Sequence, residues 1–185
     1  MLFYALLGFL NYGEMTGYDL KQVMDESRFN FWYARQSQIY TTLKKMEVDG
    51  WVISRLEAQE GRPDKRIYAI TAKGRSILME WLSDPITELE PRKEPFLLKL
   101  FFSAPLEKEQ LLTELRLRRE LHRKKLAEYQ NEARQTIVHY TGHVPPEKQD
   151  PLMWEATRRC LELHAEMYID WLDETIAIVE ENFLG

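Results

Sequence analysis

The chain has 185 residues, of which 44% are hydrophobic, 30% charged and 12% aromatic, so it can form one large domain or two small ones without a metal or a disulfide. Its single cysteine, Cys160, excludes an internal disulfide and favours a reducing compartment, so we expect a cytoplasmic location. The formal net charge of −5 by itself argues against nucleic acid as a partner, because basic side chains supply most of the affinity for phosphate.

The charge is distributed unevenly along the chain. Residues 84–185 carry 14 basic and 20 acidic side chains, whereas residues 1–83 carry 11 and 10. Within the first part, residues 28–75 hold ten basic and five acidic side chains, a net charge of +5. This shift, together with Pro85, Pro91 and Pro95, predicts an N-terminal domain over 1–83, a connecting segment over 84–104 and a helical domain over 105–185.

The first half begins with predicted helices separated by turn residues. Residues 1–10 are apolar but shorter than the about 20 residues that cross a bilayer, so we expect a buried helix and no membrane partner. Thr16 is a candidate N-cap for a second helix. A third helix runs from about Arg35 to Asp49 and ends at Gly50, a residue that tolerates positive φ.

The third helix has two different faces. At 100° per residue, Ile39, Leu43 and Met46 form an apolar stripe. The opposite face carries Ser37, Thr41, Lys44 and Val48, flanked by Tyr40 and Lys45. That face is neutral to basic, so its side chains can donate hydrogen bonds to phosphates and to base edges.

A hairpin follows the third helix. Residues 51–56 and 66–70 are short runs rich in β-branched and aromatic residues, and the polar connection between them contains Gly61 and Pro63. Thr71 caps a further helix that reaches Leu82. Three helices, a two-stranded hairpin and a return helix predict a mainly α winged helix-turn-helix, whose third helix enters the major groove and whose wing touches the DNA backbone.

Several segments resemble those of a known family. In the first half they are residues 4–8 (YALLG), 15–20 (MTGYDL), 31–32 (FW), 37–40 (SQIY), 43–46 (LKKM), 49–51 (DGW) and 66–74 (RIYAITAKG). In the second half they are residues 94–102 (EPFLLKLFF) and 168–172 (YIDWL). With these segments the chain resembles the PadR family of transcriptional regulators, and in particular its longer members, which include the phenolic-acid repressor.

The resemblance implies a homodimeric repressor that binds an inverted-repeat operator and is released by a small aromatic or hydrophobic effector. It implies base-edge and phosphate contacts from Ser37, Gln38, Tyr40 and Thr41, with Lys44 and Lys45 on phosphate and Arg62, Lys65 and Arg66 in the wing. Tyr40 would equally suit packing, and Arg66 could be an ordinary strand residue. Thr41 stands where proline is common in the family, which leaves the helix uninterrupted.

The second half contains two long predicted helices, from Pro105 to about Tyr140 and from Pro151 to Phe183. One carries an apolar stripe through Leu112, Leu115, His122, Leu126, Tyr129, Ala133, Ile137 and Tyr140, and the other through Trp154, Leu161, His164, Tyr168, Trp171, Thr175 and Val179. Stripes of this length favour pairing with a second subunit, so we expect a homodimer through the C-terminal helices. The alternative is a helical hairpin within one chain.

Aromatic and imidazole side chains of these helices, with Phe96 of the connecting segment, suggest an effector pocket. The candidates are Phe96, His122, Tyr129, Trp154, His164 and Tyr168. An imidazole could anchor the carboxylate or phenol of an aromatic ligand. The alternative is that these residues are ordinary packing residues.

Other functions have weaker support. His139 and His143, with Cys160 and His164, have the i, i+4 spacing of a zinc site and leave a metal-responsive regulator as an alternative, but we expect no metal or other cofactor. The chain has no phosphate-binding glycine loop and no H-E-x-x-H motif, and Cys160 with His164 is a weak nucleophile pair, so we expect no enzyme. A dimeric winged-helix scaffold that binds a protein partner instead of an operator remains the main alternative.

Overall fold

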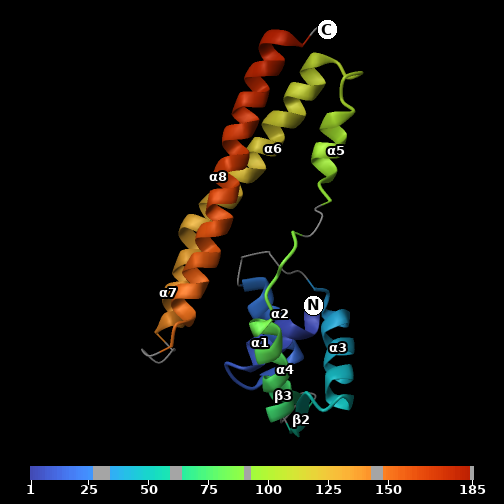
Figure 1. The fold of residues 1–185 in the computed structure, drawn as a ribbon, viewed down its shortest axis with the longest axis vertical. Helices are drawn as coiled ribbons and strands as arrows, with labels where there is room; N and C mark the ends of the chain where they lie inside the picture. Colours follow the sequence, from blue (N-terminus) through green and yellow to red (C-terminus); the bar gives the residue numbers. More distant parts are fainter. Residues whose placement is uncertain (27–33, 59–63, 90–92, 143–147, 184–185) are drawn as a thin grey trace. The chain divides into compact units, whose positions relative to one another are not determined.

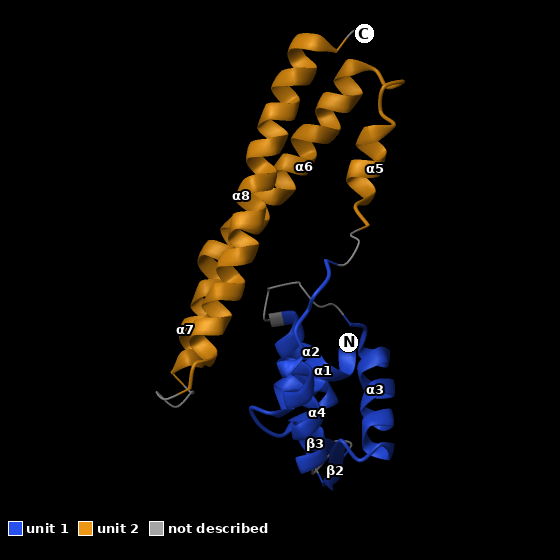
Figure 2. Cartoon of the chain, viewed as in Figure 1, with its two compact units in different colours: residues 1–89 blue, residues 90–185 orange. Residues whose placement is uncertain are grey.

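The computed structural model describes residues 1–26, 34–58, 64–89, 93–142 and 148–183. The chain divides into two compact units, residues 1–89 and residues 90–185, which Figure 2 colours separately. Among the described residues, no helix is both long enough and apolar enough to cross a membrane.

Unit 1 has the predicted element order of a winged helix (Figure 1). Its elements are α1 (Leu2–Leu10), β1 (Met15–Thr16), α2 (Gly17–Glu26), α3 (Gln36–Val48), β2 (Val52–Glu57), β3 (Lys65–Ile70) and α4 (Ala72–Ser83). The described sheet has three strands in the order β1-β3-β2, whereas the sequence predicted two. The additional strand, β1, pairs Met15 with Tyr68 and Thr16 with Ile67. A strand of two residues has no periodicity of its own, so only the pairing reveals it.

The helix boundaries follow the predicted local signals. At the start of α2 the Thr16 N–H donates to an Asp19 carboxylate oxygen over 2.9 Å, and the Asp19 N–H donates to the Thr16 hydroxyl over 3.0 Å. Gly50 follows α3 with a φ of +72°, where a side chain would be strained. The Thr71 hydroxyl accepts the Gly74 N–H over 3.0 Å at the start of α4. These three predictions are confirmed.

The core of unit 1 lies between α1, α3 and the inner face of the hairpin. The predicted stripe of α3 is confirmed, because Ile39, Leu43 and Met46 are buried. They pack in one cluster with side chains from α1, α2, the sheet and α4, among them Leu6, Leu7, Leu10, Leu20, Val52, Tyr68, Ile70 and Leu78. Burial of this stripe turns the polar face of α3 outward.

Unit 2 is built around two long antiparallel helical segments that lie side by side (Figure 1). Its elements are α5 (Pro95–Phe101), α6 (Lys108–Glu128), the π-helical turn η1 (Tyr129–Ala133), α7 (Arg134–Thr141) and α8 (Asp150–Asn182). The segment predicted as one helix to about Tyr140 is therefore divided by a π turn. At one end of the pair, Leu111, Leu112, Leu115, Tyr168, Leu172, Ile176 and Val179 form an apolar cluster.

The buried face of α8 is rotated from the predicted one. Its buried positions are Arg158, Glu162, Ala165, Tyr168, Ile169, Leu172, Ile176 and Val179. Of the predicted stripe, Tyr168 and Val179 are buried, whereas Trp154, Leu161, His164, Trp171 and Thr175 are only partly buried beside it. Two of the buried positions, Arg158 and Glu162, are charged. A search for apolar spacing therefore selected the adjacent face of the helix instead of the buried one.

Candidate nucleic-acid interface and ligand region

One face of α3 in unit 1 is polar and accessible. Ser37, Gln38 and Thr41 are exposed in its first turns, and Lys44 and Lys45 are exposed farther along. Among the described residues, neither lysine forms an ion pair. The helix therefore offers hydroxyl, amide and ammonium donors along one side, a combination suited to phosphate oxygens and to acceptors on base edges.

The side chain of Gln38 caps the N-terminus of its own helix. Its side-chain oxygen accepts the backbone N–H of Arg35 over 2.8 Å and so satisfies a donor that precedes α3. A bidentate contact to adenine needs both the amide oxygen and the amide N–H₂. The cap occupies one of the two acceptor lone pairs of this oxygen and fixes the direction of the side chain. A bidentate contact to adenine would therefore have to use the remaining lone pair in the capped geometry or release the cap.

Tyr40 packs against the second helix. A Cβ atom placed on Gly17 would lie 2.5 Å from the Tyr40 ring, so the ring rests directly on the first residue of α2. The side chain is still 37% exposed. The geometry supports the packing role that the sequence left open and assigns Gly17 as the position that makes room for the ring.

The basic residues of the wing differ in whether they form ion pairs. Lys65 is exposed at the start of β3 and forms no ion pair among the described residues. In contrast, a guanidinium nitrogen of Arg66 lies 3.4 Å from a carboxylate oxygen of Glu47 on α3, and Arg55 lies 2.7 Å from Glu14. Arg62 lies outside the described residues.

In unit 2, four of the six predicted effector residues come together. The ring centroids of His122 and Tyr168 are 4.4 Å apart and stacked, and that of His164 is 5.1 Å from Tyr168. Trp171 joins Tyr168 edge-on at 5.6 Å, and Phe96 of α5 joins Trp171 at 6.3 Å. We call these five aromatic and imidazole side chains the aromatic cluster.

Two charged side chains border the aromatic cluster, and neither was predicted from the sequence. The Arg118 guanidinium lies 5.0 Å from the centre of the Phe96 ring, a cation–π distance. The Tyr168 hydroxyl donates to a Glu94 carboxylate oxygen at 3.5 Å, a long contact. Arg118 stands one helical turn before His122, so its i, i+4 spacing was the signal that could have identified it.

Burial within the cluster lowers the pKa of His122, and the nearby Arg118 and His164 lower it further, while Glu94 opposes them. A neutral imidazole between these groups can accept or donate a hydrogen bond. With the Arg118 cation beside it, the region suits an aromatic ligand that carries an acidic group.

Tyr129 and Trp154 lie elsewhere on the helix pair. Tyr129 is seven residues beyond His122, and Trp154 is fourteen residues before Tyr168, which correspond to about 10 Å and about 20 Å along a helix. Tyr129 is buried in the π turn. The structure therefore does not gather all six predicted effector residues into one pocket.

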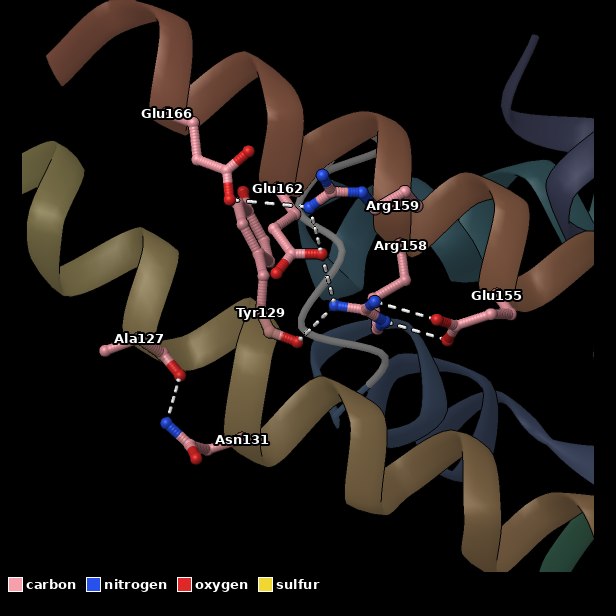
Figure 3. Close-up of polar contacts among 8 residues, drawn as sticks. All are labelled: Ala127, Tyr129, Asn131, Glu155, Arg158, Arg159, Glu162 and Glu166. Atoms are coloured by element: carbon pink, nitrogen blue, oxygen red, sulfur yellow. Dashed lines mark hydrogen bonds and ion pairs between the residues drawn. The ribbon is translucent and has the colours of Figure 1, made fainter. Parts of the chain in front are cut away.

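A buried ion-pair network surrounds the π turn (Figure 3). Arg158 donates to both carboxylate oxygens of Glu155, over 2.8 and 2.7 Å, and to Glu162 over 3.0 Å. It also donates to the backbone carbonyl of Tyr129 over 3.1 Å, while the Asn131 side chain donates to the Ala127 carbonyl over 2.8 Å. Side chains thus satisfy carbonyls at the π turn, which points to a structural role for this network.

The zinc alternative gains no support from the geometry. Across the part of the chain that the structure describes, no three His, Cys, Asp or Glu side chains converge as metal ligands. Cys160 is exposed, and His164 belongs to the aromatic cluster. His143, the fourth residue of that hypothesis, lies outside the described residues.

Comparison with known proteins gives matches over both units. Residues 6–80 match the family model described as Transcriptional regulator PadR-like family, and residues 92–180 match Virulence activator alpha C-term. Over 184 residues the chain is 28% identical to the Negative transcriptional regulator PadR of Bacillus subtilis (strain 168), across 98% of this chain and 99% of that protein.

Solved structures agree with these matches. B. subtilis PadR in complex with operator DNA has a TM-score of 0.82 at 26% identity, over 96% of this chain and 98% of that chain. The same protein in complex with p-coumaric acid has a TM-score of 0.76 at 26% identity, over 97% and 98%. The Vibrio cholerae virulence activator AphA has a TM-score of 0.73 at 29% identity, over 98% and 99%.

Proposed function

Because the chain belongs to the PadR-like family of transcriptional regulators, which are not enzymes, we propose that it is a sequence-specific operator-binding protein. The observation that carries this proposal is the polar, exposed face of α3, which stands opposite a fully buried apolar stripe. A recognition helix needs this division, because one side must hold the helix in the domain while the other meets the groove. The relative solved with operator DNA supports the same use of the fold.

The contacts follow from the chemistry of that face. Ser37 and Thr41 supply hydroxyls for base edges, and Gln38 supplies amide N–H donors. Lys44, Lys45 and Lys65 bind phosphate, where they position the protein without reading sequence. Arg62 is a further predicted wing contact.

A gel shift tests this function. We expect the full-length protein to retard a duplex from the region upstream of its own gene at concentrations that leave an unrelated duplex of equal length unbound. Equal affinity for both duplexes would contradict sequence-specific binding. No affinity for either would favour the protein-binding scaffold instead.

The proposal includes a homodimer that binds an inverted repeat through two recognition helices. Large apolar side chains remain exposed on both long helical segments of unit 2. They are Leu117, Leu121, Val138, Leu152, Met153, Leu163, Met167 and Ile178. Exposed apolar side chains in this number support contact with a second copy.

The proposal also includes release by a small aromatic effector that carries an acidic group and binds at the aromatic cluster of unit 2. The Arg118 cation beside the cluster supports an anionic ligand over a cationic one. Burial, and then Arg118 and His164, lower the pKa of His122, so its imidazole serves as a neutral hydrogen-bond partner for that ligand. The relative solved with p-coumaric acid agrees with this class.

Titration of phenolic acids and of hydrophobic cationic drugs into the protein–DNA complex tests the effector class. Dissociation by the acids alone is the expected result, whereas dissociation by the cations alone would contradict it.

We propose repression as the outcome of operator binding, in line with the negative regulator that matches nearly the whole chain, although AphA is an activator. Transcription from the upstream region, measured with and without the protein, tests this: repression predicts less transcript when the protein is present.

A further inference from the structure

Three polar side chains connect the recognition helix to the inner face of the wing. Glu47 lies in the last turns of α3, Ser54 in β2 and Arg66 in β3. The Ser54 hydroxyl donates to one carboxylate oxygen of Glu47, and a guanidinium nitrogen of Arg66 lies 3.4 Å from the other. The same nitrogen is 3.4 Å from the Ser54 hydroxyl. We call Glu47, Ser54 and Arg66 the wing brace.

The register of the hairpin explains why these groups meet. Leu56 of β2 stands directly opposite Arg66, and Ser54 stands opposite Tyr68, so Ser54 and Arg66 are diagonal neighbours on the same face of the sheet. That face turns toward the core, where Tyr68 is 2% exposed. Burial raises the pKa of Tyr68, Arg66 lowers it and Glu47 raises it, as expected if both charges lie near the phenol.

The wing brace changes the number of cations that the DNA-binding unit can offer. Lys44, Lys45 and Lys65 form no ion pair among the described residues, whereas Arg66 is paired with Glu47 and Arg55 with Glu14. A cation that already has a carboxylate partner displaces fewer counterions when it approaches phosphate. Such a residue therefore adds little to the salt dependence of binding.

We infer that Glu47 is a positioning residue, which ties the wing to α3 through Ser54 and Arg66 and withholds the charge of Arg66 from phosphate. The inference rests on the proposed DNA-binding function. It assigns Lys65 as the described wing residue that neutralises phosphate. The brace affects geometry and charge more than folding, because ion pairs this exposed contribute little to the free energy of unfolding.

The salt dependence of DNA binding by the full-length protein tests the inference. Log affinity falls as log salt rises, and Lys65→Gln should make this slope shallower by about 0.9, the value of one phosphate contact. Arg66→Gln should change the slope by much less. Glu47→Gln keeps the size of the side chain but removes its charge, so it should release Arg66 and make the slope steeper by about 0.9. The double variant Glu47→Gln with Arg66→Gln should return to the slope of Arg66→Gln.

Glu80→Gln is the matched control, since it removes one exposed carboxylate from α4, an element that contributes no residue to the wing brace. Its slope should equal that of the unmodified chain. The inference is wrong if Arg66→Gln makes the salt slope shallower by as much as Lys65→Gln does. It is also wrong if the slopes of Glu47→Gln and Glu80→Gln are equal. The slopes are measured on the upstream duplex and on the unrelated duplex. If the protein shows no sequence preference, the proposed function is contradicted, but the salt slopes of the variants can still be compared.

Hydrogen exchange of the free protein gives a readout that does not need DNA. Glu47→Ala removes both bonds of Glu47 in the wing brace, and we expect the amides of β2 and β3 to exchange several-fold faster while those of α8 are unchanged. Exchange in the wing that matches the unmodified chain would show that Glu47 does not hold the wing. A thermal unfolding midpoint close to that of the unmodified chain establishes that the variant is folded.

Discussion

Lys44 lies on the exposed side of α3, opposite the buried Ile39, Leu43 and Met46, and has no ion-pair partner among the described residues. We expect Lys44→Ala to weaken binding to all duplex sequences alike and to reduce the salt slope by about 0.9, because a lysine on phosphate carries no sequence information. Fluorescence anisotropy from low to high salt measures both effects. An unchanged slope would show that Lys44 does not contact phosphate.

Gly74 stands where α4 passes closest to the chain that precedes β2. A Cβ atom on Gly74 would lie 2.2 Å from the backbone oxygen of Trp51, which cannot move without shifting the strand. We expect Gly74→Ala to lower the free energy of unfolding by about 1–3 kcal/mol. Urea unfolding measures the loss.

Gly8 provides the matched control for Gly74. It lies within α1, and an added Cβ atom would meet nothing within 4 Å. Gly8→Ala should therefore stabilise the protein by roughly 0.5–1 kcal/mol, as expected for alanine in a helix. Similar losses in both variants would show that the close approach to Trp51 is not the cause.

Among the elements, the π turn depends on a side chain from the opposite helix. Arg158 is 5% exposed and binds Glu155, Glu162 and the carbonyl of Tyr129. Arg158→Met removes these bonds and leaves a buried carboxylate and a buried carbonyl with fewer donors, so we expect a loss of about 3 kcal/mol in the free energy of unfolding. The measurement is chemical denaturation at one protein concentration.

Arg159 is the neighbouring control, because its side chain is 47% exposed and pairs with Glu162 and Glu166. Arg159→Met should lower the free energy of unfolding much less than Arg158→Met does, because an exposed ion pair is screened by solvent. Equal effects of the two substitutions would show that burial of Arg158 does not strengthen its role at the π turn.

The packing of α6 on α8 also makes unit 2 sensitive to acid through His122. Burial lowers the pKa of His122, with Arg118 and His164 acting in the same direction and Glu94 against it. As the pH falls, the unfolded chain binds this proton before the folded chain does, so His122 should reduce the free energy of unfolding between about pH 7 and pH 5. Thermal unfolding across this range should be flatter in His122→Gln, and identical curves would contradict the prediction.

At the scale of the whole molecule, the exposed apolar side chains of unit 2 predict its assembly. Leu163 and Met167 are about half exposed and one helical turn apart on α8. We expect sedimentation equilibrium at micromolar concentration to give a dimer, and Leu163→Glu with Met167→Glu to shift it to monomer, because the charges would have to be buried at the contact. Ser76→Glu, at an exposed polar position of α4 in unit 1, should remain dimeric. A monomer in the unmodified chain would contradict the dimer.

Much of unit 1 was predictable from the sequence, because its signals lie within a few residues of one another. The Thr16 and Thr71 caps, Gly50 and the spacing of Ile39, Leu43 and Met46 all depend on local backbone geometry. The same local patterns predicted a helical second half. They proposed six effector residues together, of which His122, His164 and Tyr168 meet with Phe96 nearby, whereas Tyr129 and Trp154 lie elsewhere.

Only the tertiary structure decided which partners the polar residues have. Met15 and Thr16 became a strand because β3 lies beside them, and Arg66 gained Glu47 from another element. The buried side of α8 includes Arg158 and Glu162, which periodicity treats as exposed, because each is compensated by charges and carbonyls that the fold brings to it. Apolar spacing is a property of the local chain, whereas the pairing of a charge depends on segments that meet only when the chain has folded.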